Sequence, residues 1–405
     1  MTTSPQSAHL AATHSDAQQV TFIHTSDFQL GMTRWFFDVK AQARFDDSRL
    51  RAIARLGDLA KETGAEFIVV AGDVFEANAL EPQTMDRALD AIDALPVPVY
   101  LLPGNHDPLI PGAALERAGQ RENITVLADS APVEVRPGVE VIGAPLLART
   151  ATEDLAAKAI AGLEPTDKIR VLVAHGQCED RSGDRSPDTI DLPGLEAALD
   201  AGVIDYVAMG DTHSAGQIGT SGRVWFSGAP EVTDFHDRRE DVEGGEVNSG
   251  KALVVSVDKP SADSADVTVD ECEVGEWTFD ALHFEVADSA DVKDLLDLLE
   301  AYPEKPRTVV KYSIVGTLGL EATRELEEGL AAKENVFGAL YERKRLMDLH
   351  LEPSEDELAN LPLTGYASDA MSDLLAMSAG SAGPDHTEAA RDAVNLLFRL
   401  SKESK

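Results

Sequence analysis

The chain has 405 residues and a formal net charge of −37, and 43% of its residues are hydrophobic. This length predicts two domains with appendages, because one hydrophobic core rarely extends over so many residues. Cys178 and Cys272 are the only cysteines, too few for a disulfide framework or a zinc cluster. No apolar segment approaches the length of a membrane span, and the acidic charge opposes indiscriminate adhesion to polyanions. We expect a cytoplasmic globular protein without membrane contact.

The elements expected along the chain divide it into successive parts. Residues 1–19 are polar and lack an apolar signal region, which predicts a disordered leader. Over residues 20–258, apolar strand-like runs alternate with helical stretches such as Ser48 to Thr63 and Pro82 to Leu95. This alternation predicts a first domain of the α/β class.

A second, smaller domain is expected over residues 275–350. Thr278 to Val286 alternates like a half-buried strand, and a helix, a strand, a helix and a last strand at Arg345 to Leu349 follow it. This α+β unit contains no cluster of catalytic residue types. Residues 351–385 are rich in Ser, Ala, Gly and Pro, which predicts a linker that includes a short helix around residues 369–377.

A last helix is expected over residues 386–405. Asp385 followed by Glu388 is a helix-start signal. The apolar stripe of this helix consists of Ala390, Ala393, Val394, Leu397 and Leu400. The stripe either packs against the helix's own domain or docks on a partner protein at the end of a flexible tether. The sequence leaves both alternatives open.

Five apolar runs of the first domain end in residues that commonly bind metals. With their polar ends they are Val20 to Asp27, Phe67 to Asp73, Val97 to Asp107, Ile169 to His175 and Asp205 to His213. Runs such as Phe67 to Val70 are apolar on both faces, as strands buried in a parallel sheet are. Ligands bind at the carboxyl ends of such strands, so the Asp, Asn, His and Gln side chains there should converge on one crevice.

The ordered motifs at these strand ends resemble those of the calcineurin-like metallophosphoesterases. They are Asp27-Phe28-Gln29, Gly72-Asp73, Gly104-Asn105-His106-Asp107, His175 and Gly210-Asp211-Thr212-His213. Further motifs are similar to those of the SbcD-type DNA repair exonucleases, namely His24-Thr25-Ser26-Asp27 with Leu30-Gly31, Ala71 to Glu76, and Phe226 to Pro230. This resemblance implies a β-sandwich flanked by helices, a smaller capping domain and a C-terminal helical tail that grips an SbcC-like ATPase.

The resemblance also implies which residues bind two divalent metal ions and which act on the substrate. Asp73 would bridge the ions, and His106 would act on the scissile phosphate, with Asp107 as a candidate orienter. Two such ions can clamp a phosphodiester and activate a water for its hydrolysis. The other ligands would be Asp27, Gln29 and His213 for one ion, and Asn105, His175 and Asp211 for the second.

Gln29 and Asp211 depart from the pattern of the SbcD family, which usually has histidines at both positions. Each ion therefore loses one imidazole, because Gln29 offers a neutral amide oxygen and Asp211 adds a third carboxylate. Such an oxygen-rich site favours Mn²⁺, with Mg²⁺ as the alternative. Glutamine and aspartate side chains can still bind metals, so we interpret the site as an active one with an altered metal preference.

The expected function is phosphodiester hydrolysis by a metal-dependent DNA exonuclease or endonuclease subunit in double-strand-break repair. Its expected partners are DNA ends, an SbcC-like coiled-coil ATPase and a second copy of the chain in a homodimer. Action on DNA would associate the protein with the nucleoid. Two alternatives remain open: a phosphatase or cyclic-nucleotide phosphodiesterase of the same superfamily, and a weakly catalytic subunit that binds DNA ends.

Some aromatic, basic and histidine residues allow more than one interpretation. Trp35, Phe36 and Phe37 either stack on an unpaired base or pack in a core. His24 is expected to be a hydrogen-bonded core or supporting histidine, and His236 a loop residue. Two basic stretches either contact phosphates or form solvated helix faces, and they consist of Arg34, Arg44, Arg49, Arg51 and Arg55, and of Arg343-Lys344-Arg345.

Overall fold

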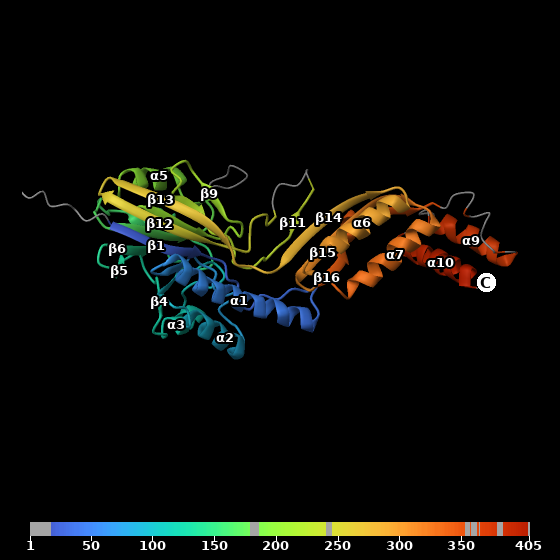
Figure 1. Ribbon diagram of the computed structural model, residues 1–405, viewed down its shortest axis with the longest axis horizontal. Coiled ribbons are helices and arrows are strands. Elements are labelled where there is room, and N and C mark those ends of the chain that lie inside the picture. The colour runs from blue at the N-terminus through green and yellow to red at the C-terminus, as the bar shows by residue number, and fades with distance from the viewer. Residues whose placement is uncertain are drawn as a thin grey trace, which may run out of the picture. The chain divides into compact units, whose positions relative to one another are not determined.

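The computed structural model describes residues 18–178, 186–239, 245–352, 357, 363, 365–378 and 384–403. These residues form two compact units, and the helices and strands of both are drawn in Figure 1. Within the described ranges, unit 1 comprises residues 18–33, 46–233 and 248–276, and unit 2 comprises residues 34–45, 234–247 and 277–403. Residues 1–17 of the expected leader and part of the expected linker lie outside the described residues.

The first sheet of unit 1 has six strands in the order β13-β12-β1-β2-β3-β4. The strands from β1 to β4 run parallel, whereas β12 pairs antiparallel with β1 and β13 pairs antiparallel with β12. Parallel neighbours end at the same edge, so the residues after β1, β2 and β3 lie close together. The strands are β1 (Gln18–Thr25), β2 (Ile68–Val70), β3 (Val99–Leu101), β4 (Ile124–Val126), β12 (Lys251–Ser261) and β13 (Ser264–Glu273).

The second sheet of unit 1 has the order β5-β6-β7-β8-β10-β9. Its four central strands are parallel, and the two edge strands β5 and β9 pair antiparallel with their neighbours. The strands are β5 (Val133–Arg136), β6 (Val139–Gly143), β7 (Ile169–His175), β8 (Tyr206–Gly210), β9 (Gly216–Ile218) and β10 (Val224–Phe226).

The two sheets share an apolar core, which makes unit 1 a β-sandwich. Strand β2 shows why its sequence is apolar at every position. Val69 belongs to the core between the sheets, whereas Ile68 and Val70 belong to a core under helices, and all three are fully buried. Successive side chains of a strand point to opposite faces, so a strand covered on both sides needs an apolar residue at each position. The buried parallel strands predicted from the sequence are confirmed.

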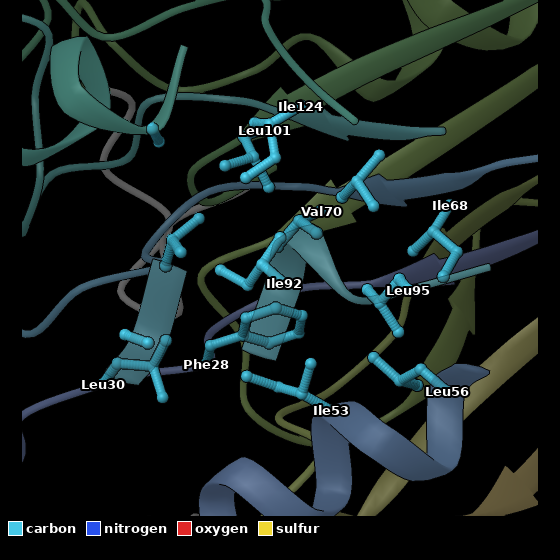
Figure 2. Close-up of a cluster of buried hydrophobic side chains, with 14 of the residues drawn as sticks. Phe28, Leu30, Ile53, Leu56, Ile68, Val70, Ile92, Leu95, Leu101 and Ile124 are labelled. Atoms are coloured by element: carbon cyan, nitrogen blue, oxygen red, sulfur yellow. The ribbon is translucent and has the colours of Figure 1, made fainter. Parts of the chain in front are cut away.

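Helices complete the packing of unit 1. Figure 2 shows the core on the first sheet, in which Ile53 and Leu56 of α1 lie near Ile68 and Val70 of β2. Helices α4 and α5 contribute to the corresponding core on the second sheet. This mixed architecture confirms the predicted α/β fold class. The helices are α1 (Val39–Thr63), α2 (Pro82–Asp93), α3 (Ala114–Ala118), α4 (Leu155–Ile160) and α5 (Leu192–Asp200).

Unit 2 is built on a parallel sheet of five strands. In place of the single last strand expected at Arg345 to Leu349, two short strands pair with successive parts of β15. A 3-10 turn at Lys344–Leu346 separates them and interrupts the pairing. The strands are β11 (His236–Asp237), β14 (Thr278–Val286), β15 (Thr308–Leu318), β16 (Ala339–Glu342) and β17 (Asp348–Leu351).

The C-terminal helix packs on its own unit. Val394 and Phe398 of α10 are buried and share a core with Met371 of α9 and Leu320 of α7. This is the arrangement expected if the apolar stripe packs against its own domain. No helix in the described ranges is long and apolar enough to cross a membrane. The helices of unit 2 are α6 (Ser289–Ala301), α7 (Leu320–Glu334), α9 (Tyr366–Ala376), which lies within the expected linker, and α10 (Pro384–Glu403).

A buried ion pair links the two sheets of unit 1. The ammonium of Lys259 on β12 lies 2.8 Å from Oδ1 of Asp205, which precedes β8, and the two side chains are 1% and 2% exposed. Lys259 also donates to the carbonyl of Lys168 at 3.0 Å. Each charge of the pair therefore depends on the other for compensation, because water does not reach them.

Replacing Lys259 with Met should lower the free energy of unfolding by about 3–5 kcal/mol, because Asp205 would keep a buried charge without its cation. Lys251→Met is the matched control. Lys251 lies on the same strand and pairs with Glu271 at 2.7 Å, but these side chains are 22% and 30% exposed, so its loss should cost about 1 kcal/mol or less. Urea unfolding followed by circular dichroism measures both. Equal losses would contradict the role of burial.

Candidate metal centre

The polar residues that follow the parallel strands of unit 1 meet at the carboxyl ends of both sheets. The first sheet supplies the residues after β1, β2 and β3, and the second supplies those at the ends of β7 and β8. Asp27, Asp73 and His175 each offer one ligand atom, and these atoms lie within 4.8 Å of one another. The seven ligands expected from the sequence are Asp27, Gln29, Asp73, Asn105, His175, Asp211 and His213, and the contacts below connect all of them.

The backbone takes an unusual conformation at four of these residues. Asp27, Gln29, Asp73 and Asp211 have positive φ angles of 53°, 48°, 52° and 94°, and no other non-glycine residue in the described ranges has a positive φ. For L-residues this conformation costs about 1–3 kcal/mol each, and it persists only where the surrounding contacts enforce it. Such strain gathers at functional sites, and here all of it lies at expected ligands.

Asp73 lies at the centre of the site, and its two carboxylate oxygens have different neighbours. Oδ2 accepts a hydrogen bond from Nε2 of Gln29 at 3.2 Å. Oδ1 lies 3.4 Å from Nε2 of His175 and accepts the backbone N–H of His106 at 2.9 Å. Asp73 therefore stands between a group of ligands near Gln29 and a group near His175.

In the group near Gln29, Asp27 is fully buried. Its Oδ2 accepts the hydroxyl of Ser26 at 2.5 Å and the backbone N–H of Asp211 at 3.2 Å. Its Oδ1 lies 3.7 Å from Nε2 of His213. Asp27, Gln29 and His213, the residues expected to hold one ion, are called the first ligand group here; Asp27 lies near His213 and Gln29 contacts Asp73.

In the other group, a backbone contact fixes the imidazole of His175. Nδ1 donates to the carbonyl of Ala71 at 2.8 Å, and such a bond orients a histidine that binds metal through its second nitrogen. Nε2 lies 2.8 Å from Oδ1 of Asn105 and 3.7 Å from Oδ1 of Asp211. The second ligand group consists of Asn105, His175 and Asp211.

Two glycines allow the loops after the strands to approach this closely. A Cβ atom at Gly72 would overlap the imidazole of His175, and Gly72 also has a φ of +94°. A Cβ atom at Gly104 would overlap the carboxylate and the backbone nitrogen of Asp73. A side chain at either position would therefore displace a ligand.

The site holds more negative than positive charge. Burial raises the pKa of Asp27 to about 6. Burial also acts to raise the pKa of Asp73, but the hydrogen bond and charge of His175 outweigh it, so that this pKa is lowered. Burial acts to lower the pKa of His175, whereas its hydrogen bond to Asp73 and the nearby carboxylates raise it to about 10. The carboxylates thus require a positive charge, which a divalent cation would also supply.

Two buried oxygens of the first ligand group accept no hydrogen bond from any described residue. They are Oδ1 of Asp27 and Oε1 of Gln29. Leaving a buried acceptor without a partner costs about 1–3 kcal/mol. Carboxylate and amide oxygens are ligands that Mn²⁺ and Mg²⁺ prefer, so one ion would satisfy both atoms. The residues of the site therefore fit a divalent metal ion.

His106 lies at the open side of the site. Nδ1 of its ring donates to the carbonyl of Glu76 at 3.0 Å. This leaves Nε2 without a proton in the neutral ring, 4.0 Å from Oδ2 of Asp73, and the side chain is 40% exposed. A substrate can therefore reach this nitrogen.

Asp107, the candidate orienter of His106, makes its hydrogen bonds to the backbone. It is fully buried, and its two oxygens accept the backbone N–H groups of Gly104 at 2.8 Å and of Phe75 at 3.1 Å. Burial raises its pKa to about 7. The group that contacts the ring of His106 is the carbonyl of Glu76, whereas Asp107 holds the loop that carries Asn105.

Two residues that contact the ligands were not identified from the sequence. The amide of Gln177 donates to the carboxylate of Asp211, and the hydroxyl of Thr233 lies 2.5 Å from Nδ1 of His213. Gln177 stands two residues after His175, so alternation along the strand would have indicated it. Thr233 lies in a loop with no pattern, and no sequence signal points to it.

His24 is the hydrogen-bonded core histidine that the sequence analysis expected. Its Nε2 donates to the carbonyl of Met209 at 3.1 Å, and its Nδ1 accepts the hydroxyl of Tyr206 at 3.0 Å. Burial lowers its pKa to about 3, so it stays neutral. His236, which was expected in a loop, lies in the short strand β11 and pairs with Asp280 of β14.

A pocket of about 270 Å³ adjoins the second ligand group. Its lining includes Asn105, His175 and Asp211 together with the charged side chains of Arg149 and Asp188. The pocket is therefore lined by one basic side chain as well as by three of the expected ligands.

Comparison with known proteins finds one family that is similar to part of the chain. The sequence profile described as calcineurin-like phosphoesterase matches residues 20–215, and no curated protein matches the chain. Among solved structures, TT1561 of Thermus thermophilus is 12% identical, with a TM-score of 0.39, over 64% of this chain and 100% of its own. A dimetal phosphatase from Danio rerio is 12% identical, with a TM-score of 0.35, over 61% of this chain and 98% of its own. Likenesses this weak say nothing of function. The profile, the sandwich and the residues at its strand ends agree that residues 20–215 are similar to the calcineurin-like phosphoesterases.

Proposed function

We propose that this protein is a two-metal phosphodiesterase that hydrolyses DNA at its ends and works with a long coiled-coil ATPase. The observation that carries the proposal is the position of Asp73, whose two carboxylate oxygens face different ligand groups. A carboxylate shared by two ions requires such a position. The match of residues 20–215 to the calcineurin-like phosphoesterases supports phosphoester hydrolysis.

In this proposal each ligand group holds one divalent ion, Mn²⁺ by preference and Mg²⁺ as the alternative. Bound ions would stabilise negative charge on the phosphate oxygens and provide a water nucleophile at neutral pH. His106 acts on the leaving oxygen, because its Nε2 is the nitrogen that the bond to Glu76 leaves available. In the imidazolium form this nitrogen donates a proton to that oxygen.

The pocket beside the second ligand group offers one cation, Arg149, to a substrate that carries more than one phosphate. A DNA strand continues to the next phosphate, which the guanidinium of Arg149 in this pocket suits.

The specificity for DNA ends and the protein partners rest on the motifs shared with the SbcD-type exonucleases. Unit 2 would act as the capping domain, and a homodimer associated with the nucleoid would be the working form. Leu396 and Leu400 of α10 are 52% and 51% exposed and offer apolar contacts for the ATPase. ATP-stimulated cleavage of linear duplex, with covalently closed circles left intact, would support this part of the proposal.

Asp73→Ala should abolish hydrolysis and remove both ions, because the two ligand groups lose their shared carboxylate. Unit 1 should still fold, since its apolar strands do not depend on this residue. Elemental analysis, thermal unfolding, and hydrolysis of p-nitrophenyl phosphate, bis-p-nitrophenyl phosphate and linear DNA in Mn²⁺ test this. A folded Asp73→Ala variant that retains most of the activity would refute the two-metal proposal. A wild type that hydrolyses only p-nitrophenyl phosphate would establish the phosphatase alternative.

His106→Ala should keep the metal content and lower turnover by at least about 100-fold, the scale of a lost acid or charge-stabilising group. Asp107→Ala is the contrasting variant. It leaves the backbone N–H groups of Gly104 and Phe75 without their acceptor, so it should lower stability and metal content as well as activity. Metal content that falls with activity in His106→Ala would make His106 a ligand and reject its assigned role.

The double variant Gln29→His with Asp211→His should bind Zn²⁺ or Co²⁺ relatively better than the wild type does. It adds one imidazole to each ligand group and removes one negative charge, which suits ions that prefer nitrogen. Competitive metal titration, followed by hydrolysis in each metal, measures the change. Both substitutions are needed together, because ligands coupled through Asp73 need not act additively. Unchanged selectivity would show that these side chains do not reach the ions.

A further inference from the structure

Unit 2 contains a cluster of eight aromatic rings. Adjacent centroids are separated by 4.8–6.3 Å, mostly in edge-to-face geometry, an arrangement that stabilises packed aromatic side chains. Four of the rings belong to the hydrophobic core, since Phe45, Phe235, Trp277 and Phe279 are all at most 7% exposed. The other members are Trp35, Phe36, Phe37 and Tyr341.

Trp35 does not share this role, because 81% of it is exposed. Its ring nevertheless has neighbours that hold it in place. The centroid lies 5.1 Å from that of Tyr341 and 5.7 Å from that of Phe36, both in edge-to-face contact. An indole supported in this way, with much of its surface in water, is prepared to stack on another flat ring at little cost in side-chain entropy.

Several basic side chains lie near this ring cluster, although the chain as a whole is acidic. The chain has 72 acidic and 35 basic residues. Next to the cluster, the charged groups that act on Lys311 and Tyr341 include three arginines and two aspartates. Two of the arginines, Arg239 and Arg343, share Asp237 as their ion-pair partner. The ammonium of Lys311 itself lies 4.0 Å from the ring centroid of Phe235. The other groups are Arg34, Arg239, Arg343, Asp234 and Asp237.

We propose that Trp35 stacks on an unpaired base of a nucleic-acid strand, and that Arg34, Lys311 and Arg343 attract its phosphates. Exposed aromatic rings combined with cationic side chains are what sequence-independent binding of single strands requires. The inference deepens the proposed nuclease function, on which it rests, by naming the form of the substrate. The strand that engages unit 2 is unpaired, so the DNA ends would be frayed or overhanging.

Val39 is the reason to test a second class of ligand. It is 87% exposed and stands four residues after Trp35, so the two side chains could belong to a contact with a protein, including a second copy of this chain. Stacking on a base requires only the aromatic ring, whereas an apolar protein contact would use both side chains. The cationic side chains of Arg34 and Lys311 favour nucleic acid.

The experiment measures binding of a fluorescein-labelled oligodeoxythymidine to the full chain in EDTA, where no hydrolysis occurs. Trp35→Ala should weaken binding by about 5- to 150-fold, the range for loss of one stacked base, and Trp35→Phe should weaken it less. Val39→Ala, the matched control, should bind as the wild type does. Binding should also quench intrinsic tryptophan fluorescence in the wild type, and the quenching should be lost in Trp35→Phe.

An abasic strand of the same length separates stacking from charge. It keeps the phosphates and lacks the bases, so it should bind wild type and Trp35→Ala equally weakly, and a double-mutant cycle isolates the stacking contribution. Equal affinity of wild type and Trp35→Ala for the thymidine strand would overturn the inference. Val39→Ala binding the thymidine strand as weakly as Trp35→Ala would also overturn it. A change of oligomeric state in either variant would do the same, because it would assign this surface to a protein contact. None of these results bears on hydrolysis, which Asp73→Ala tests separately.

Discussion

The site of unit 1 depends on one electrostatic constraint, which is that carboxylates are held where water does not solvate them. Asp27 and Asp73 are 0% and 2% exposed, and each buried carboxylate costs several kcal/mol unless cations or hydrogen-bond donors compensate it. The chain supplies part of this compensation through His175 and the hydroxyl of Ser26. The orphaned Oδ1 of Asp27 shows that the compensation is incomplete. Metal binding and the stability of the loops are therefore expected to be coupled.

The shape of the site follows from the same constraint. Several ligands can share a cation only if the loops after neighbouring strands come within a few ångströms of one another. Positive φ angles at Asp27 and Asp73, and the missing Cβ atom at Gly72, permit this approach. These conformations are unfavourable by themselves, and the sandwich tolerates them because apolar residues such as Val69 anchor the strands on both faces. Rigidity in the core thus supports strain at the strand ends.

Periodicity predicted the parts of this structure that one segment determines alone. The strand β2 and its polar end at Asp73 were predictable, because an all-apolar run followed by a ligand indicates a buried parallel strand. Contacts between distant segments were not predictable in this way. Thr233 touches His213 from a loop without any pattern. Trp35 is exposed whereas the adjacent Phe36 is half-buried, because more rings from distant segments contact Phe36. The resemblance to a known family, rather than periodicity, assigned the ligands to two groups.

The exposure of positions 29 and 211 accounts for the residues found there. Gln29 is 1% exposed and lies beside Asp73, whereas the side chain of Asp211 is 24% exposed. A carboxylate at position 29 would add a third buried negative charge next to Asp27 and Asp73, which desolvation and like-charge repulsion disfavour. At position 211 water and the amide of Gln177 stabilise the charge. If both side chains bind ions as proposed, a neutral oxygen at the buried position and a charged one at the more exposed position keep the electrostatic cost of the site low.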